Sequence, residues 1–197
     1  MRAMRAHIGG WLLLLLVVLA QPPGQVAADT KFDLIAAPGR FLRRATHAYT
    51  DEFPLGQVQN QAYGYLFPQG PFFLLGHLLH VPDWLVQRAW WWLLLCLAYS
   101  GALVLARRVG IRGTFPQVLT ATLYALSPRI LTTLTAISSE AWPVALLPWT
   151  LVPLTRRTPL VAPAVVAVAC MGAVNATATV AACLPAFVLL IARRSYA

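Results

Sequence analysis

Residues 9–33 read GGWLLLLLVVLAQPPGQVAADTKFD, an uncharged apolar run that ends in a short acidic and polar stretch. Arg2 and Arg5 precede the run, and Asp29 is the first acidic residue of the chain. This pattern is typical of a helix that enters a lipid bilayer and carries a polar group to the far surface. It therefore predicts a first membrane span over about residues 9–28, with the Asp29 carboxylate at the far interface.

The composition excludes an ordinary soluble domain. Of the 197 residues, 59% are hydrophobic and only 11% are charged, and the mean hydropathy is +0.66. A net charge of +9 would suggest nucleic-acid binding in a soluble chain. A chain this apolar is instead typical of a protein that crosses the membrane several times. We therefore predict an integral membrane protein whose partners include membrane lipids and no nucleic acid.

The charged residues fall into two sets of connections between the apolar runs. One set holds most of the 15 basic residues and no acid, whereas the other holds the remaining basic residues and all six acids. The first set consists of Arg2, Arg5, Arg107, Arg108, Arg112, Arg156, Arg157, Arg193 and Arg194. Because cytoplasmic connections are enriched in Lys and Arg, this division predicts a cytoplasmic N-terminus and acids that all lie outside.

The apolar runs predict an all-α, polytopic helical bundle with about six spans. Their expected bounds are residues 9–28, 86–106, 114–134, 141–155, 160–174 and 177–192, with a long outer loop over residues 29–83. The fourth run contains three prolines, so we expect a kinked or broken segment that packs against protein. As an alternative for the N-terminus, residues 26–28 also fit a signal-peptide cleavage site, and cleavage would make Asp29 the first residue.

The outer loop contains two segments that are too short to span a bilayer, which predicts interfacial helices. In the first, basic residues recur at helical spacing: Arg40, Arg43, Arg44 and His47. This face either binds anionic lipid headgroups or places Arg43 or Arg44 against a substrate phosphate. The second segment carries His77 and His80, which are too few ligands to predict a metal site. A requirement for a divalent metal stays open.

Residues 51–70 form the one long polar stretch of the sequence. Gln59, Asn60 and Tyr63 belong to the residue types that hydrogen-bond sugar hydroxyls and stack on sugar rings. Ordinary surface loops use the same residues, so the stretch is either a sugar-binding loop or a structural one.

Two further polar features lie near the outer ends of later spans. Arg129 falls at the upper edge of the third span, where it either reaches the interface or meets Glu140 or a phosphate. Ser138 and Ser139 are expected to cap a helix that begins at Glu140.

Five long motifs, in order along the chain, resemble a known family. They are ADTKFDL (28–34), PLGQVQNQAYGYLFPQGPFFLLG (54–76), QRAWWWLLL (87–95), ALSPRILTTLTAISSE (125–140) and MGAVNATATVAACLP (171–185). Together they resemble the N-terminal membrane part of the mycobacterial α-(1→3)-arabinofuranosyltransferase D family, which belongs to the C-type fold glycosyltransferases. The resemblance implies a polyprenyl-phosphate arabinofuranose donor, an arabinan acceptor in arabinogalactan or lipoarabinomannan, and a reaction on the periplasmic face of the bacterial inner membrane.

The resemblance also implies roles for particular residues. The aspartate of the family's ADTK-type run falls on Asp29, which would act as the general base on the acceptor hydroxyl while polyprenyl phosphate leaves with inversion. Asp33 is the rival base, one helical turn further on. The expected substrate-binding residues are Asp33, Arg43, Arg44, Gln59, Asn60, Tyr63, Arg129 and Glu140. Among these, Arg43, Arg44 and Arg129 would bind the donor phosphate, and no cofactor is expected beyond the donor itself.

Family enzymes are much longer than this chain, so we expect an N-terminal fragment of a longer transferase. Two alternatives stay open. One is a transferase of the same fold that uses another polyprenyl-phosphate sugar, such as mannose. The other is a non-catalytic membrane protein that transports lipid-linked sugars or acts as an assembly scaffold.

Overall fold

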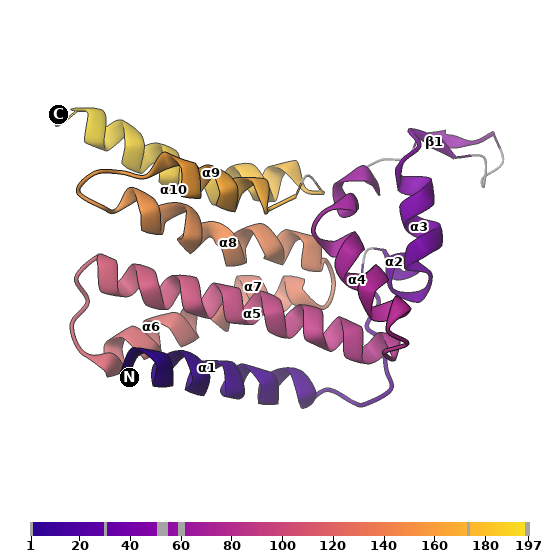
Figure 1. Cartoon of the computed structure of the whole chain (residues 1–197), viewed down its shortest axis with the longest axis horizontal. Helices are drawn as coiled ribbons and strands as arrows, with labels where there is room; N and C mark the ends of the chain where they lie inside the picture. Colours follow the sequence, from indigo (N-terminus) through magenta and orange to yellow (C-terminus); the bar gives the residue numbers. More distant parts are fainter. Residues whose placement is uncertain (1, 30, 51–54, 59–61, 173, 196–197) are drawn as a thin grey trace.

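The structure is a computed structural model that describes residues 2–29, 31–50, 55–58, 62–172 and 174–195. A bundle of long helices occupies most of the molecule, and a smaller lobe of short elements lies at one end of it (Figure 1). The bundle consists of α1 (Arg2–Leu19), α5 (Asp83–Arg108), α6 (Thr114–Ala125), α7 (Pro128–Leu134), α8 (Ser138–Leu154), α9 (Val161–Ala169) and α10 (Ala176–Ser195).

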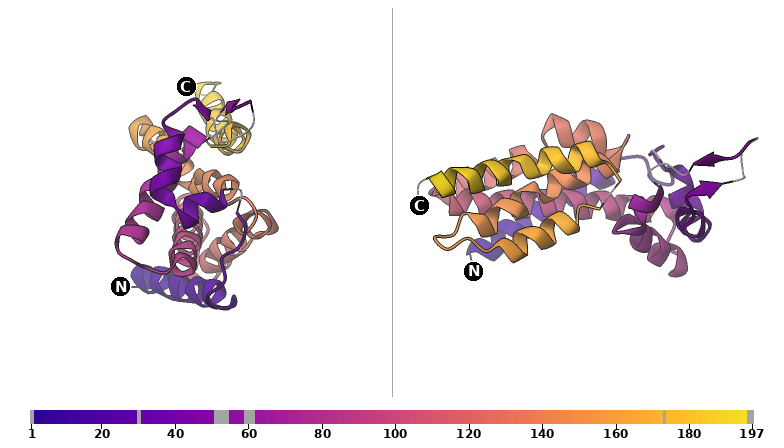
Figure 2. Two further views of the ribbon diagram at one scale, coloured as in Figure 1. Left: turned by 90° about the vertical axis from the view of Figure 1, so that its right-hand side faces the viewer. Right: turned by 90° about the horizontal axis from the view of Figure 1, so that it is seen from above.

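The smaller part, here called the outer lobe, is built from the described residues between 32 and 78. It comprises α2 (Phe32–Ala36), α3 (Pro38–Ala45), β1 (Tyr49–Thr50), β2 (Gln57–Val58), the 3-10 helix η1 (Ala62–Leu66) and α4 (Gln69–Leu78). The two strands pair antiparallel and point away from the bundle (Figure 2, right). Helices therefore occur at both predicted positions: α3 begins at Pro38, and α4 contains His77. Their placement at a membrane interface stays a prediction.

The ends of the bundle differ in charge. Both chain termini and the α5–α6 and α8–α9 connections lie at the end away from the outer lobe (Figure 1). We call it the basic end, because the nine arginines of the acid-free set lie at its helix ends and connections. The fold thus gathers the residues that the charge pattern groups together, and the assignment of this end to the cytoplasm stays a prediction.

Helix α5 forms the centre of the bundle. Leu94, Leu95 and Leu103 are fully buried there, and small residues let neighbouring helices approach closely. A Cβ atom added to Gly101 would lie 2.7 Å from the Trp149 indole nitrogen of α8. Close helix approach of this kind fixes how α5 and α8 pack.

Helix α8 is continuous from Ser138 to Leu154 despite its three prolines, so the segment that was expected to be kinked or broken is not broken. A kink stays a prediction. Pro148 has no N–H to donate to the carbonyl of Val144. The hydroxyl of Tyr124 on α6 donates to that carbonyl instead. The three prolines are buried, which confirms that this helix packs against protein.

Two helices are long and apolar enough to cross a membrane by length and composition, namely Asp83–Arg108 and Ala176–Arg193, and Met4–Leu19 is a shorter apolar helix among the described residues. The third predicted span is two helices, α6 and α7, separated before Pro128. On α10, Val180, Leu184 and Phe187 are all exposed, as expected for a face that contacts lipid or another membrane helix. The predicted count of six spans remains a prediction.

Helix α1 is part of the bundle. Its Trp11 indole N–H donates to Ser100 Oγ at 2.9 Å, and the Trp92 indole N–H donates to the Trp11 carbonyl at 2.9 Å. The Tyr99 hydroxyl donates to the Ala6 carbonyl at 3.0 Å. These bonds attach both halves of α1 to α5.

Candidate functional site

The residue predicted as the base lies where the bundle meets the outer lobe. The carboxylate of Asp29 accepts a hydrogen bond from the Ser138 backbone N–H, with 3.2 Å to Oδ1 and 3.4 Å to Oδ2. The Ser138 hydroxyl also donates to Oδ2 of Asp29. Ser138 is the first residue of α8 and only 1% exposed. The N-terminus of α8 is thus satisfied by a carboxylate from a residue 109 positions away in sequence.

This contact corrects the predicted serine caps. Helix α8 begins at Ser138 rather than Glu140, and its N-cap residue Ile137 makes no side-chain capping bond. Ser138 and Ser139 instead connect the bundle to the outer lobe. Gln69 Nε2 donates to Ser138 Oγ at 3.1 Å, and the Tyr65 hydroxyl donates to Ser139 Oγ at 3.3 Å. All four residues are buried, so the lobe is attached to α8 at the same turn that Asp29 contacts.

The segment leading to Asp29 is held by α5. Gln87, which is 1% exposed, accepts from the Ala27 N–H at 2.9 Å and donates to the Ala27 carbonyl at 3.0 Å. The neighbouring Arg88 donates to the Gln25 carbonyl at 3.3 Å, and its guanidinium lies 4.5 Å from the Trp91 ring centroid. Our sequence reasoning missed Gln87. The sequence feature that could have identified it is a glutamine within an apolar membrane segment, because such a side chain needs a polar partner.

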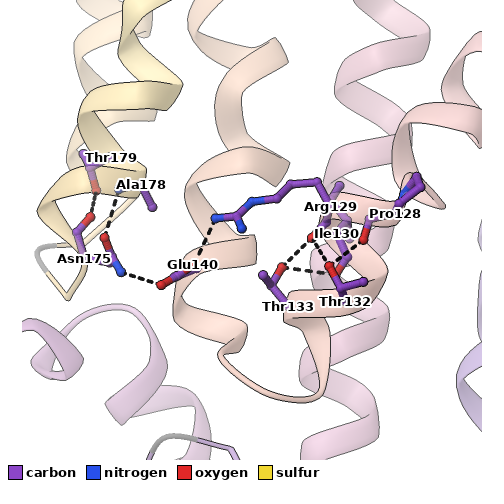
Figure 3. Close-up of polar contacts among 9 residues, drawn as sticks. All are labelled: Pro128, Arg129, Ile130, Thr132, Thr133, Glu140, Asn175, Ala178 and Thr179. Atoms are coloured by element: carbon purple, nitrogen blue, oxygen red, sulfur yellow. Dashed lines mark hydrogen bonds and ion pairs between the residues drawn. The ribbon is translucent and has the colours of Figure 1, made fainter.

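A second polar group joins α7, α8 and α10 near the same end (Figure 3). Arg129 donates to Glu140 Oε2 at 2.9 Å, and Asn175 Nδ2 donates to Glu140 Oε1 at 2.9 Å. The oxygen of the Asn175 side chain accepts the Ala178 N–H at 2.9 Å and so caps α10. Of the alternatives that the sequence leaves open for Arg129, the structure shows the contact with Glu140.

The remaining predicted residues are distributed over the outer lobe. Asp33 and Arg44 form an ion pair, whereas Arg43 lies on the exposed side of α3. Tyr63 is 59% exposed. Gln59 and Asn60 lie outside the described residues. Among the residues that the structure describes, no group of three or more His, Cys, Asp or Glu side chains is arranged to hold a metal ion.

Asp29 contacts the first turn of α8, and Glu140 belongs to that turn. The candidate base and the Arg129–Glu140 ion pair are therefore held by the same turn. An apolar cavity of about 670 Å³ lies along α1, α5 and α8. It is lined from Phe72 of the outer lobe to Met4 near the basic end, with Trp11 and Trp92 between them. The Asp29 carboxylate and Arg129 thus lie at one end of the bundle, and the apolar lining of this cavity extends along the bundle from that end.

Comparison with known proteins agrees with the sequence motifs. Residues 13–197 match the family model described as alpha-(1->3)-arabinofuranosyltransferase, N-terminal GT-C domain. The chain is 52% identical over 183 residues to the alpha-(1->3)-arabinofuranosyltransferase of Mycobacterium tuberculosis, and 50% identical over 181 residues to that of Mycolicibacterium smegmatis. Each match covers 88% of this chain and 13% of the relative.

Solved structures give the same result for the fold. A cryo-EM structure of a mutant arabinofuranosyltransferase AftD from Mycobacteria superposes with a TM-score of 0.90 and 46% identity, covering 95% of this chain and 16% of that one. A second AftD structure gives a TM-score of 0.84 and 48% identity, covering 91% and 14%. The chain therefore spans about a seventh of the length of these relatives. It belongs to the alpha-(1->3)-arabinofuranosyltransferase family and matches its N-terminal GT-C domain.

Proposed function

We propose that this chain is the N-terminal membrane part of a glycosyltransferase that transfers arabinofuranose from a polyprenyl-phosphate donor to cell-wall arabinan. The observation that carries the proposal is the placement of Asp29, in a chain of this family, at the junction of the outer lobe and the bundle. The reaction would occur with inversion on the periplasmic face of the inner membrane, which requires the basic end to face the cytoplasm.

In the proposed step, the Asp29 carboxylate takes the proton of an acceptor hydroxyl. The acceptor oxygen then forms a bond to the anomeric carbon as the bond from that carbon to the phosphate oxygen breaks, and polyprenyl phosphate leaves with the electron pair. The backbone N–H and the hydroxyl of Ser138 donate to this carboxylate and hold it at the junction of the bundle and the outer lobe. A phosphate leaving group is already charged and needs no general acid.

The donor phosphate would be bound by arginine. Arg129 is the favoured candidate, because its side chain is 57% exposed while one amino group is bound to Glu140, and a guanidinium has five N–H donors. Arg44 is already paired with Asp33. The same pair makes Asp33 a less suitable base than Asp29. Arg43 and Tyr63 would contact the donor or the arabinan from the outer lobe. Gln59 and Asn60 stay candidates for the same role from the sequence alone.

The apolar cavity along α1 and α5 fits the polyprenyl part of the donor. It is lined almost entirely by apolar side chains and begins beside Phe72 in the outer lobe. A polyprenyl chain bound in this cavity would hold the donor phosphate near the outer-lobe end of the bundle, where Asp29 and Arg129 lie. Membrane anchoring of the donor would then raise its local concentration at the site.

The test is transfer of labelled arabinofuranose from its polyprenyl phosphate to an arabinan oligosaccharide. It uses membranes that contain this chain, and membranes with a chimera in which it replaces the matching segment of the M. tuberculosis relative. In whichever of the two proteins transfers arabinofuranose, Asp29→Asn should lower transfer by about 100-fold or more, as expected for loss of a general base. Asp83→Asn, which also neutralises an acid in the first turn of a helix, should leave transfer unchanged.

Equal transfer by the parent and Asp29→Asn would overturn the base assignment. Polyprenyl-phosphate mannose serves as the competing donor: efficient transfer of mannose in place of arabinofuranose would overturn the donor assignment. A chimera that folds and inserts but transfers neither sugar, while the intact relative is active, would favour a non-catalytic role for this segment.

A further inference from the structure

A second cavity lies at the basic end of the bundle, away from the proposed active site. It has a volume of about 440 Å³ and lies between α5, α8 and α9. Apolar side chains line most of it, and Arg108 and Arg156 are its charged residues. Its volume falls within the usual range for small-molecule sites.

The cavity extends about as deep as one leaflet of a bilayer. Its lining residues extend from Leu160 to Cys170 over α9 and its flanking residues, from Arg108 to Leu97 on α5, and from Arg156, just after α8, to Leu146 on α8. At 1.5 Å per residue, each of these stretches is about 15 Å long. The hydrocarbon core of a bilayer is about 30 Å thick, so each stretch covers half of it. Arg108 at the end of α5 and Arg156 just after α8 lie at the ends of their stretches that face the bundle's basic end.

The charge around the opening is of one sign. The connections α5–α6 and α8–α9 and the last turn of α10 contain no acid. Arg108 and Arg156 are exposed, and Arg193 donates to the Arg156 carbonyl at 2.7 Å. Guanidinium groups bind phosphate oxygens well, and basic pockets between membrane helices are sites for anionic lipid headgroups.

We propose that this cavity binds one anionic phospholipid, with its phosphate at Arg108 and Arg156 and an acyl chain along α9. The apolar lining would bind the acyl chain, and the two arginines would select a negatively charged headgroup. This cavity shares Leu97 and Trp149 with the lining of the cavity proposed for the donor, but its phosphate end lies at the basic end of the bundle, opposite to Asp29. The proposal does not depend on the chain's being a transferase. A neutral phospholipid would fill the apolar part without the gain from the arginines.

The experiment compares binding of phosphatidylglycerol and phosphatidylcholine to the purified full chain in detergent, by native mass spectrometry. We expect phosphatidylglycerol to bind at least 10-fold more tightly. The double variant Arg108→Gln/Arg156→Gln should lose that preference. The control Arg112→Gln/Arg157→Gln removes the same charge from the same end of the bundle but from residues that do not line the cavity, and it should keep the preference. Loss of preference in both double variants, or equal binding of the two lipids by the parent, would overturn the proposal.

A second measurement uses the unaltered chain, so it does not depend on a variant that folds. Phosphatidylglycerol with a photoreactive acyl chain should label residues 160–170 of α9 after illumination, and unlabelled phosphatidylglycerol should suppress the labelling. Suppression by inorganic phosphate alone would indicate a site for free phosphate instead of a lipid. Labelling elsewhere but not on α9 would show that a lipid chain does not occupy the cavity. Either result would overturn the proposal.

Discussion

Replacing Gln87 with leucine should release the segment that carries Asp29. The side chain makes two hydrogen bonds to the backbone of Ala27, one to its N–H and one to its carbonyl. Leucine has a similar volume, so packing in α5 should be kept while both backbone groups lose their partner. Each unsatisfied group costs about 1–3 kcal/mol. Because Ala27 is only partly buried, we expect the lower part of that range, about 2–4 kcal/mol for the two groups together.

Hydrogen exchange measured by mass spectrometry can follow this effect on residues 25–29. A loss of about 2–4 kcal/mol corresponds to roughly 30- to 800-fold easier local opening. Gln117→Leu is the matched control, because Gln117 also uses both ends of its amide, with Arg107 and with the Ile111 carbonyl, at the opposite end of the bundle. It should leave exchange of residues 25–29 unchanged. Exchange within about threefold of the parent in Gln87→Leu would refute the reasoning.

Two further predictions concern packing inside the bundle. Gly10→Ala should destabilise the chain by about 1–3 kcal/mol, because the added Cβ would lie 2.3 Å from the Tyr99 ring. The control Gly9→Ala, whose Cβ has nothing within 4 Å, should be close to neutral. Thermal unfolding followed by tryptophan fluorescence measures both variants. Tyr124→Phe should cost about 1 kcal/mol, since it removes the donor to the carbonyl that Pro148 leaves free. In a Pro148→Ala background the restored helical N–H can satisfy that carbonyl, so the cost of Tyr124→Phe should fall, and an unchanged cost in this double-mutant cycle would contradict the explanation.

The helical membrane architecture and the clustering of charge could be predicted because both depend on local composition. Apolar runs of sufficient length and the arginines between them gave the order of the helices and the residues that share the basic end. Helix bounds were less predictable. The expected span over residues 160–174 contains the shorter helix Val161–Ala169, because end positions depend on tertiary contacts that a hydropathy pattern does not contain.

The polar contacts of the site could be predicted only in part. Arg129 and Glu140 are close in sequence, and their contact was one of the alternatives that the sequence left open. The bond from Ser138 to Asp29 joins residues 109 positions apart, and the bond from Gln87 to Ala27 joins residues 60 apart. Neither pairing follows from spacing along a helix. The prediction that Ser138 and Ser139 cap the helix was wrong for the same reason, since the group that satisfies the start of α8 comes from a distant segment.

The first turn of α8 connects several parts of the molecule, and this affects how Asp29 should be tested. Ser138 binds Asp29 and Gln69, Ser139 binds Tyr65, and Glu140 follows directly with its own partners on α7 and α10. Truncating Asp29 to alanine would therefore remove a structural contact together with any catalytic group. Asparagine keeps an oxygen that can accept the Ser138 N–H but lacks the negative charge and the basicity. A large loss of transfer in Asp29→Asn with an unchanged unfolding temperature would thus indicate a chemical role, whereas a parallel fall in both would indicate that Asp29 mainly supports the start of α8.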